Sequence, residues 1–309
     1  MSLFEDANWP RAGKWLAGES LEETSGRLAI LGAPVSLASI TPGRCDLAPA
    51  AIRKALDRFS TYHLESRRDV RALRVHDLGD LQVSSCSAEE AFEPISAAVA
   101  SALVKADALV LLGGDNSITR PGVHGLGCIG LSRCGLLTLD AHLDLRDLDH
   151  GLTNGNPVRA LLRDGLLGRQ IVQIGVQSFA NSAAYAQLAH ANGIRVMTVN
   201  GALQRGIGYV IEDALFHLER HVDCIYVNLD LDVLDRVYAP ATPGSRPGGL
   251  APHHIRHAAR VCGAHTKVRV LDLVEIDPTR DIADATVLTA AACLLEFAAG
   301  MVERLERES

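Results

Sequence analysis

Short apolar runs alternate with amphipathic stretches along most of this 309-residue chain. Eight runs rich in Val, Ile and Leu predict β-strands. They span Leu28–Gly32, Ala72–His76, Ala108–Leu112, Leu136–Leu139, Ile171–Gly175, Arg195–Val199, Cys224–Leu229 and Val268–Val274. Between them, apolar positions three to four residues apart predict helices, which include Pro49–Phe59, Ala88–Lys105, Ser182–Asn192, Gly208–His221, Pro252–Cys262 and Ala285–Arg304.

Strands that alternate with helices favour a parallel sheet with crossover helices on both of its faces. No linker, composition break or internal repeat interrupts this alternation. We therefore predict an α/β fold, a three-layer α/β/α sandwich whose mainly parallel sheet has about eight strands. A single domain is expected over residues 1–309, with residues 1–26 as an N-terminal extension. Ligands of such sheets bind outside the carboxyl ends of the strands.

Composition narrows the partners and the compartment. A net charge of −7 argues against nucleic acid and anionic membranes as main partners. No apolar run looks long enough for a membrane span, and the acidic N-terminus lacks a signal-peptide pattern. Seven scattered cysteines without a CxxC spacing predict reduced thiols in a cytoplasmic protein: Cys45, Cys86, Cys128, Cys134, Cys224, Cys262 and Cys293.

Two acidic motifs come directly after predicted strands. The first contains Asp140, His142 and Asp144, and the second contains Asp230 and Asp232. In extended backbone, alternate residues project to the same side, so the members of each motif can converge. Unpaired buried carboxylates are costly, and clusters of them usually hold a cation. Carboxylates with one imidazole suit Mn²⁺ or Mg²⁺ better than a structural Zn²⁺.

Each motif alone also fits a simpler structure, a solvated polar loop or a strand end with a helix-capping Asp. Their shared position at strand ends favours a two-metal site that activates a water. Two further strand ends carry polar candidates. Asn116 offers a carbonyl oxygen as a metal ligand, and Glu275 can hold a cationic substrate nitrogen or act as an ion-paired structural residue.

These motifs, taken in order, resemble the ureohydrolase family, which comprises arginases, agmatinases and formimidoylglutamases. The resemblance extends over residues 28–296, and the family fold is the sandwich already predicted. The matching segments are Leu31–Pro34, Pro42–Arg44, Ala48–Arg53, Asp77–Asp80, Gly113–Ser117, Asp140–Asp144, Asn154–Pro157, Asp230–Asp235, Pro247–Leu250 and Val274–Pro278.

The resemblance implies a binuclear Mn²⁺ site whose ligands are Asn116, Asp140, His142, Asp144, Asp230 and Asp232. By the family pattern, Asp140 and Asp230 would bridge the two ions. A hydroxide between the ions would attack the carbon of an amidine or guanidine, because the metals lower the pKa of the bound water. Asp144 and Glu275 would be the catalytic residues: Asp144 would orient the hydroxide, and Glu275 would hold the substrate nitrogen.

Two positions depart from the family pattern. The family usually has His where this chain has Asn116, and an amide oxygen is a weaker ligand, so we expect the ion that uses Asn116 to bind weakly. Arginases and agmatinases have His where this chain has Asn154, and an amide cannot transfer a proton in that way. The segment around Asn154 looks most like formimidoylglutamases, so Asn154 is a candidate substrate-binding residue.

Formimidoylglutamate carries two carboxylates, for which Arg146 and Arg159 are candidate partners because Arg binds carboxylates bidentately. Either arginine can instead form only a surface ion pair. The sequence thus predicts a Mn²⁺-dependent hydrolase of a linear amidine C–N bond that converts N-formimidoyl-L-glutamate to L-glutamate and formamide in histidine degradation. Its relatives imply a homo-oligomer. A urea-releasing agmatinase or guanidino-acid ureohydrolase stays open, as does a binding or regulatory protein with an impaired metal site.

Overall fold

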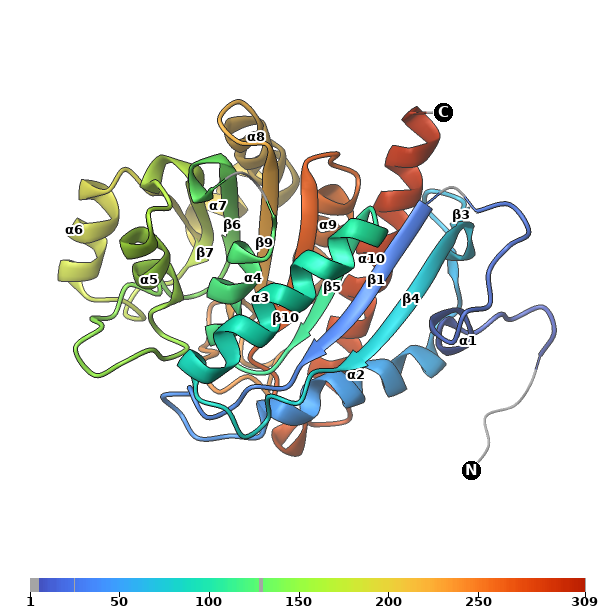
Figure 1. Ribbon diagram of the computed structural model, residues 1–309, viewed down its shortest axis with the longest axis horizontal. Coiled ribbons are helices and arrows are strands. Elements are labelled where there is room, and N and C mark those ends of the chain that lie inside the picture. The colour runs from blue at the N-terminus through green and yellow to red at the C-terminus, as the bar shows by residue number, and fades with distance from the viewer. Residues whose placement is uncertain (1–5, 25, 128–129, 309) are drawn as a thin grey trace.

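The computed structural model describes residues 6–24, 26–127 and 130–308. An eight-stranded sheet forms its centre, in the order β4-β1-β5-β10-β9-β6-β7-β8, and each neighbouring pair runs parallel (Figure 1). The strands are β1 (Gly26–Ala33), β4 (Leu73–Asp80), β5 (Ala108–Gly113), β6 (Cys134–Leu139), β7 (Ile171–Val176), β8 (Arg195–Thr198), β9 (Cys224–Asp230) and β10 (Val268–Val274). Two short strands, β2 (Tyr62–His63) and β3 (Arg68–Asp69), pair antiparallel outside this sheet.

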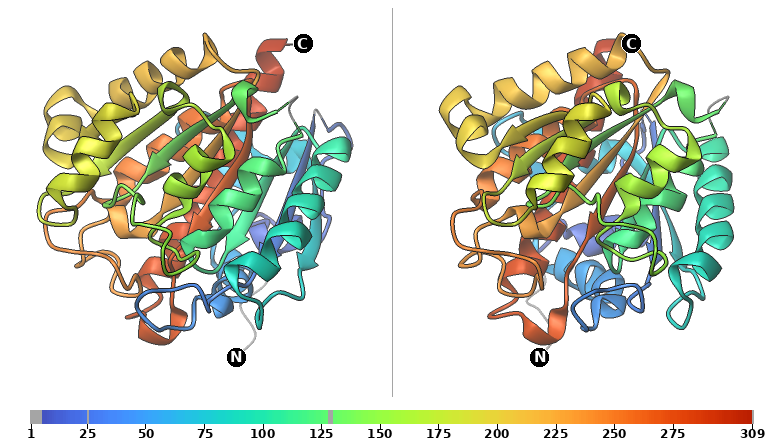
Figure 2. Two further views of the ribbon diagram at one scale, coloured as in Figure 1. Left: turned by 60° about the vertical axis from the view of Figure 1, so that its left-hand side comes forward. Right: turned by 90° about the vertical axis from the view of Figure 1, so that its left-hand side faces the viewer.

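Helices cover both faces of the sheet, which confirms the three-layer sandwich. One face packs against α1 (Ala12–Leu16), α2 (Ala48–Ala55), α7 (Val199–Arg205), α8 (Ile207–Glu219), α9 (Pro252–Gly263) and α10 (Ala285–Glu308). The other face packs against α3 (Ala88–Lys105), α4 (Thr119–His124), α5 (Pro157–Asp164) and α6 (Ala183–Ala191). In the right view of Figure 2, gold α8 and teal α3 lie on opposite sides of the sheet.

Short 3₁₀ helices complete the connections between these elements. Six of them are Cys45–Leu47, Leu56–Arg58, Val70–Ala72, Leu131–Arg133, Gly168–Gln170 and Pro278–Arg280, and the other two lie in the candidate active site.

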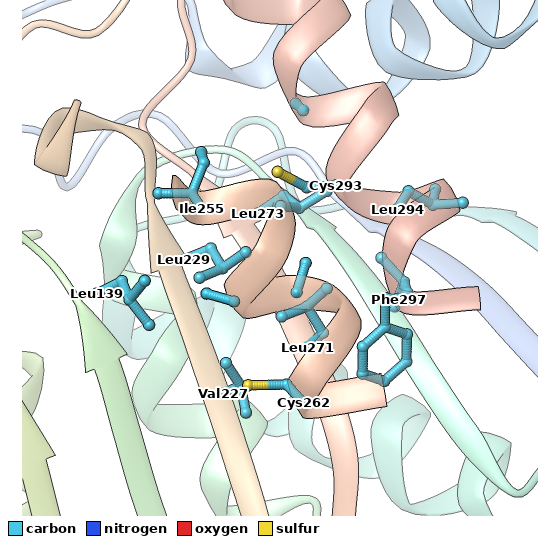
Figure 3. Packing of buried hydrophobic residues seen from close by; sticks show 14 of the residues in the cluster. Leu139, Val227, Leu229, Ile255, Cys262, Leu271, Leu273, Cys293, Leu294 and Phe297 are labelled. Atoms are coloured by element: carbon cyan, nitrogen blue, oxygen red, sulfur yellow. The ribbon is translucent and has the colours of Figure 1, made fainter. Parts of the chain in front are cut away.

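An apolar core between the sheet and helices α9 and α10 fixes the central strands. Figure 3 shows Leu229 and Leu271 of the sheet with Cys262 of α9 and Phe297 of α10, and all four are almost fully buried. Burying each Leu or Phe side chain contributes about 1.5–3 kcal/mol. The central strands are therefore held rigidly, and so are the polar residues that follow them.

We expected no apolar run long enough to span a membrane, but one helix meets the criteria of length and composition alone. The stretch Ala285–Arg307 in α10 contains an 18-residue window with a mean hydropathy of 1.8. Within the fold, 83% of that window is buried, and α10 packs against α9 and α2. The helix is apolar on nearly all sides because other elements cover it, which is typical of a core helix.

Cys224 departs from the reduced thiols that the sequence predicted, because it is disulfide-bonded. Cys45, Cys86, Cys134, Cys262 and Cys293 are free thiols, and Cys128 lies outside the described residues. A disulfide depends on how close two cysteines come in the folded chain, and spacing along the sequence does not report that distance.

Candidate active site

Four adjacent strands in the middle of the sheet, β5, β10, β9 and β6, carry the candidate residues at their carboxyl ends. Asp140 follows β6, Asp230 ends β9 and Glu275 follows β10, whereas Asn116 begins a 3₁₀ helix after β5. A second 3₁₀ helix, Leu231–Val233, follows β9 directly. Because the strands are parallel neighbours, these side chains meet at one edge of the sheet.

Asp140, His142 and Asp232 form the tightest group. One ligand atom of each lies within 4.8 Å of the other two. Nδ1 of His142 is 2.8 Å from Oδ2 of Asp232 and 3.5 Å from Oδ1 of Asp140. The backbone N–H of Ala141 donates to Asp232, and that of Asp232 donates to Asp230. Backbone amides therefore hold carboxylate oxygens and one imidazole nitrogen in a convergent arrangement, which is the donor set that Mn²⁺ accepts.

Asp144 and Asp230 are buried acids that form no ion pair within the described parts of the chain. Burial raises the pKa of both carboxyls well above the usual range. The charge of Asp140 raises the pKa of Asp144 further, and the charge of Asp232 does the same for Asp230. A group of buried carboxylates stays ionised near neutral pH only beside a cation. The residues at this edge therefore fit a metal site.

His142 carries the positive charge of the site in the absence of metal. Although burial lowers the pKa of His142, the charge of Asp232 and the hydrogen bond to Asp140 outweigh it and raise the pKa to about 11. Burial raises the pKa of Asp232, but the charge and hydrogen bond of His142 bring it below the ordinary value. This histidine therefore compensates the carboxylate of Asp232.

Both residues expected to be catalytic have left-handed backbone conformations. The φ angle is +53° at Asp144 and +65° at Glu275. Residues other than glycine rarely adopt such angles, which cost about 1–3 kcal/mol each and persist where the surrounding structure enforces them. Backbone strain of this kind clusters at functional sites. The sequence of neither segment indicates the left-handed conformation.

Asn116 presents its amide nitrogen, and not its oxygen, to the acids. Nδ2 donates to Oδ2 of Asp144 at 2.6 Å, while Oδ1 accepts from the hydroxyl of Thr119 at 2.8 Å and from Nδ2 of Asn228 at 3.0 Å. Nδ2 of Asn228 also donates to Oδ1 of Asp272 at 2.8 Å. Because a carboxylate oxygen accepts hydrogen bonds, this contact fixes the orientation of the Asn228 amide and, through it, that of the Asn116 amide. In this arrangement Asn116 holds Asp144, whereas the sequence predicted a carbonyl ligand.

Glu275 is oriented through one of its two carboxylate oxygens. Oε1 accepts from the backbone N–H of Asn116 at 2.7 Å and from Nδ2 of Asn154 at 3.0 Å. Burial, with the charge of Asp115, raises the pKa of Glu275 to about 8. Asn154 is fixed in turn, because its Oδ1 accepts from the backbone N–H of Ile40 at 3.0 Å. The arrangement makes Asn154 a positioning residue for Glu275.

A cavity of about 370 Å³ opens onto this cluster. Of the arginines expected near substrate, Arg146 lines it, whereas Arg159 lies on α5 and does not. A further arginine, Arg246, lines the cavity and places Nη1 2.8 Å from Nε2 of His142. Sequence reasoning missed Arg246 because it lies well beyond the end of β9 and just outside the matching segment Pro247–Leu250. The acidic and amide residues of the lining are Asp144, Asp230, Asp232, Glu275, Asn154 and Asn181.

Comparisons with known proteins find similar sequences and structures over almost the whole chain. The model of the arginase family matches residues 26–300. A formimidoylglutamase of Halalkalibacterium halodurans is 35% identical over 308 residues, and the match covers 96% of each chain. The crystal structure of formimidoylglutamase from Bacillus subtilis has a TM-score of 0.89 and 30% identity, covering 97% of this chain and 94% of that one. Formiminoglutamase of Trypanosoma cruzi with Mn²⁺ shares the fold, with a TM-score of 0.85, 24% identity and coverage of 96% and 99%.

Proposed function

The chain belongs to the arginase family, whose hydrolases act on amidine C–N bonds, and we propose that its substrate is N-formimidoyl-L-glutamate. Water would cleave the bond between the formimidoyl carbon and the glutamate nitrogen, which yields L-glutamate and formamide. The observation that carries the proposal is the similarity to formimidoylglutamases over almost the whole chain. The cavity supports it, since acids lie beside arginines as an amidine with carboxylates requires.

We propose Mn²⁺ as the cofactor, held in a two-ion site. Asp140, His142 and Asp232 would hold one ion, Asp144 would supply oxygen to the other, and Asp230 would contribute to both. When bound, the ions would supply a water of lowered pKa as the nucleophile. The buried carboxylates without cationic partners support this assignment, as does the Mn²⁺ of the similar protein from Trypanosoma cruzi.

The residues of this chain would bind the substrate and move a proton. Oε2 of Glu275 has no hydrogen bond to a described residue and can accept from an amidinium N–H, while Asn154 keeps Oε1 in place. Asp144, held at Oδ2 by Asn116, has Oδ1 available to take the proton of the nucleophile. It would pass that proton to the departing glutamate nitrogen, as a general base and then a general acid.

Glutamine at position 275 should lower kcat/KM by about a hundredfold or more, a loss that one charge-assisted hydrogen bond accounts for. Glu275→Gln can keep both bonds that Oε1 now accepts, from Asn116 and Asn154. Its amide nitrogen would replace Oε2 and present a donor to the donor of the substrate. Steady-state kinetics with unchanged Mn²⁺ content would check this. Activity within threefold of the native enzyme would exclude Glu275 from substrate binding.

Histidine at position 116 should tighten the weaker ion by about tenfold, because it would add an imidazole ligand where the amide now presents a donor to Asp144. Asn116→His would place a ring nitrogen beside Asp144, where Nδ2 of the amide now donates. Titration of the metal-free protein with Mn²⁺ by calorimetry would resolve the two affinities. Equal affinities in the native protein and the variant would show that position 116 does not contact the metal.

The direct test is an assay of the Mn²⁺-loaded protein for glutamate release from N-formimidoyl-L-glutamate. Rapid release would support the proposal. Urea from a panel of agmatine and guanidino acids, without glutamate from the amidine, would replace it with a guanidine hydrolase. Stoichiometric Mn²⁺ without turnover of either class would favour a binding or regulatory protein.

A further inference from the structure

Two arginines from different loops line the cavity beside the acidic cluster. Arg146 follows β6, and Arg246 lies in the connection between β9 and α9. Neither forms an ion pair with a described residue, whereas Arg53, Arg120 and Arg256 all bind carboxylates. The lining of the cavity therefore carries two guanidinium groups without anionic partners as well as four acidic residues. Its positive and negative charges are separated, so it can bind a substrate that carries both.

Arg246 keeps one edge of its guanidinium group free. Nη1 donates to the carbonyl oxygen of Gly244 at 2.9 Å and lies 2.8 Å from Nε2 of His142. Nε and Nη2 have no acceptor among the described residues. That edge is one of the two-donor faces with which arginine binds a carboxylate bidentately.

Two glycines allow these loops to approach the site closely. A Cβ atom at Gly244 would lie 2.2 Å from Oδ2 of Asp232 and 3.1 Å from Cε1 of His142. A Cβ atom at Gly155 would lie 2.8 Å from Cδ of Arg146, so the stem of that arginine packs directly on the backbone of residue 155. The backbone at Gly244 therefore lies directly against Asp232 and His142, and the stem of Arg146 lies against residue 155, while both arginines are solvent-exposed.

We propose that Arg246, through its Nε and Nη2 edge, binds one carboxylate of the substrate, and that Arg146 binds the other. The inference rests on the proposed function, since it takes the amidine end of the substrate to lie at Glu275. A substrate with a cationic amidine at one end and two carboxylates at the other matches the charges of the lining. A cationic tail, such as the amine of agmatine, would face two guanidinium groups and be repelled. Arg246 and Arg146 together then set the preference for a dicarboxylate.

The test compares Arg246→Gln and Arg146→Gln with the native enzyme on three amidines. These are N-formimidoyl-L-glutamate, N-formimidoyl-4-aminobutyrate, which lacks the α-carboxylate, and N-formimidoyl-L-norvaline, which lacks the side-chain carboxylate. Arg246→Gln should raise the KM for the dicarboxylate about tenfold or more and change kcat by less than about threefold. For the compound that lacks the carboxylate bound by Arg246, the Arg246→Gln variant and the native enzyme should have the same KM. Arg146→Gln should show this pattern with the other compound.

Two further variants separate a binding role from damage to the fold. Arg163→Gln removes an exposed arginine of α5 that lies outside the cavity and should leave every KM unchanged. Arg246→Lys keeps the charge without the two-donor edge and should recover only part of the lost affinity. Equal KM increases for all three amidines in Arg246→Gln, or no increase for any, would overturn the proposal.

Calorimetric binding of L-glutamate to the Mn²⁺-loaded protein gives a readout that does not depend on turnover. Arg246→Gln should weaken this binding about tenfold. If the native protein binds glutamate through Arg246 but releases none from the amidine, the proposed function fails and the carboxylate site stands. If the native protein hydrolyses the amidine and both variants bind glutamate as it does, the site fails and the function stands. Absence of both binding and hydrolysis would overturn both.

Discussion

Replacing Asp230 with alanine will abolish Mn²⁺ binding at both positions and lower kcat/KM by about a thousandfold or more, equivalent to roughly 4 kcal/mol of transition-state stabilisation. Asp230 ends β9 between the strands that carry Asp140 and Glu275, and it is almost fully buried. No other described side chain can take its central place without moving a strand. The measurement is Mn²⁺ content after dialysis, together with glutamate release from the amidine.

The neutral variant Asp230→Asn separates loss of metal from loss of fold. Its side-chain oxygen can still accept the hydrogen bond that Asp232 N–H now donates to Oδ1. In the presence of a chelator it should melt at or above the temperature of the native protein, because a buried carboxylate near Asp232 and Asp140 is removed. It should also lose the increase in Tm that Mn²⁺ gives the native protein.

A matched substitution, Asp149→Ala, removes an exposed aspartate of the loop that follows the site and should change neither property. Retained metal and activity in Asp230→Ala would contradict the assignment of the site. A large fall in the chelated Tm of Asp230→Asn would instead give this carboxylate a structural role.

The sheet could be predicted from the sequence because its six inner strands are largely buried on both faces, although the edge strands β4 and β8 are partly exposed. Buried strands appear as continuous apolar runs, and all eight predicted strands overlap strands of the sheet. The strand predicted at Arg195–Val199 ends one residue earlier, since Val199 already begins α7. Helices α1, α4, α5 and α7 were not predicted, because each has only five to eight residues and too few turns to show a periodic pattern.

The location of the site followed from the same argument, but its internal contacts did not. Asp140, His142 and Asp232 converge as alternating residues after strands should. The orientation of Asn116 depends on Asn228 and Asp272, which come from other strands, and the position of Arg246 depends on a long loop. These contacts join segments that are far apart in the chain, so a local sequence pattern cannot predict them.

The stability of the metal-free protein should fall as the pH rises from about 5 to 8. Glu275 has a pKa of about 8 in the fold, against an ordinary value of 4.5, and Asp115 and Asp272 each have a pKa of about 6 because of burial. Between the ordinary and the raised values, the folded chain binds more protons than the unfolded chain. Stability therefore decreases with pH in this window, by about 1.4 kcal/mol per pH unit for each extra proton bound.

The raised pKa of His142 acts in the same direction at higher pH. Its stabilising charge is fully present below pH 6.5 and is lost as the pH rises toward its folded value of about 11. Glu275 alone should contribute on the order of 4 kcal/mol between pH 5 and pH 8. Melting curves of chelator-treated protein across this range would measure the slope, and Glu275→Gln should make it shallower.

Mn²⁺ should reverse this dependence, because the ion binds deprotonated ligands and compensates their charge. The increase in Tm on adding Mn²⁺ should therefore be larger at pH 8 than at pH 5.5. A chelated protein whose Tm stays level or rises over this range would mean that the acids titrate near their ordinary values and that water enters the cluster. The carboxylates of Asp144 and Asp230 would then no longer require a cation, and the physical argument for a metal at this edge of the sheet would lose its basis.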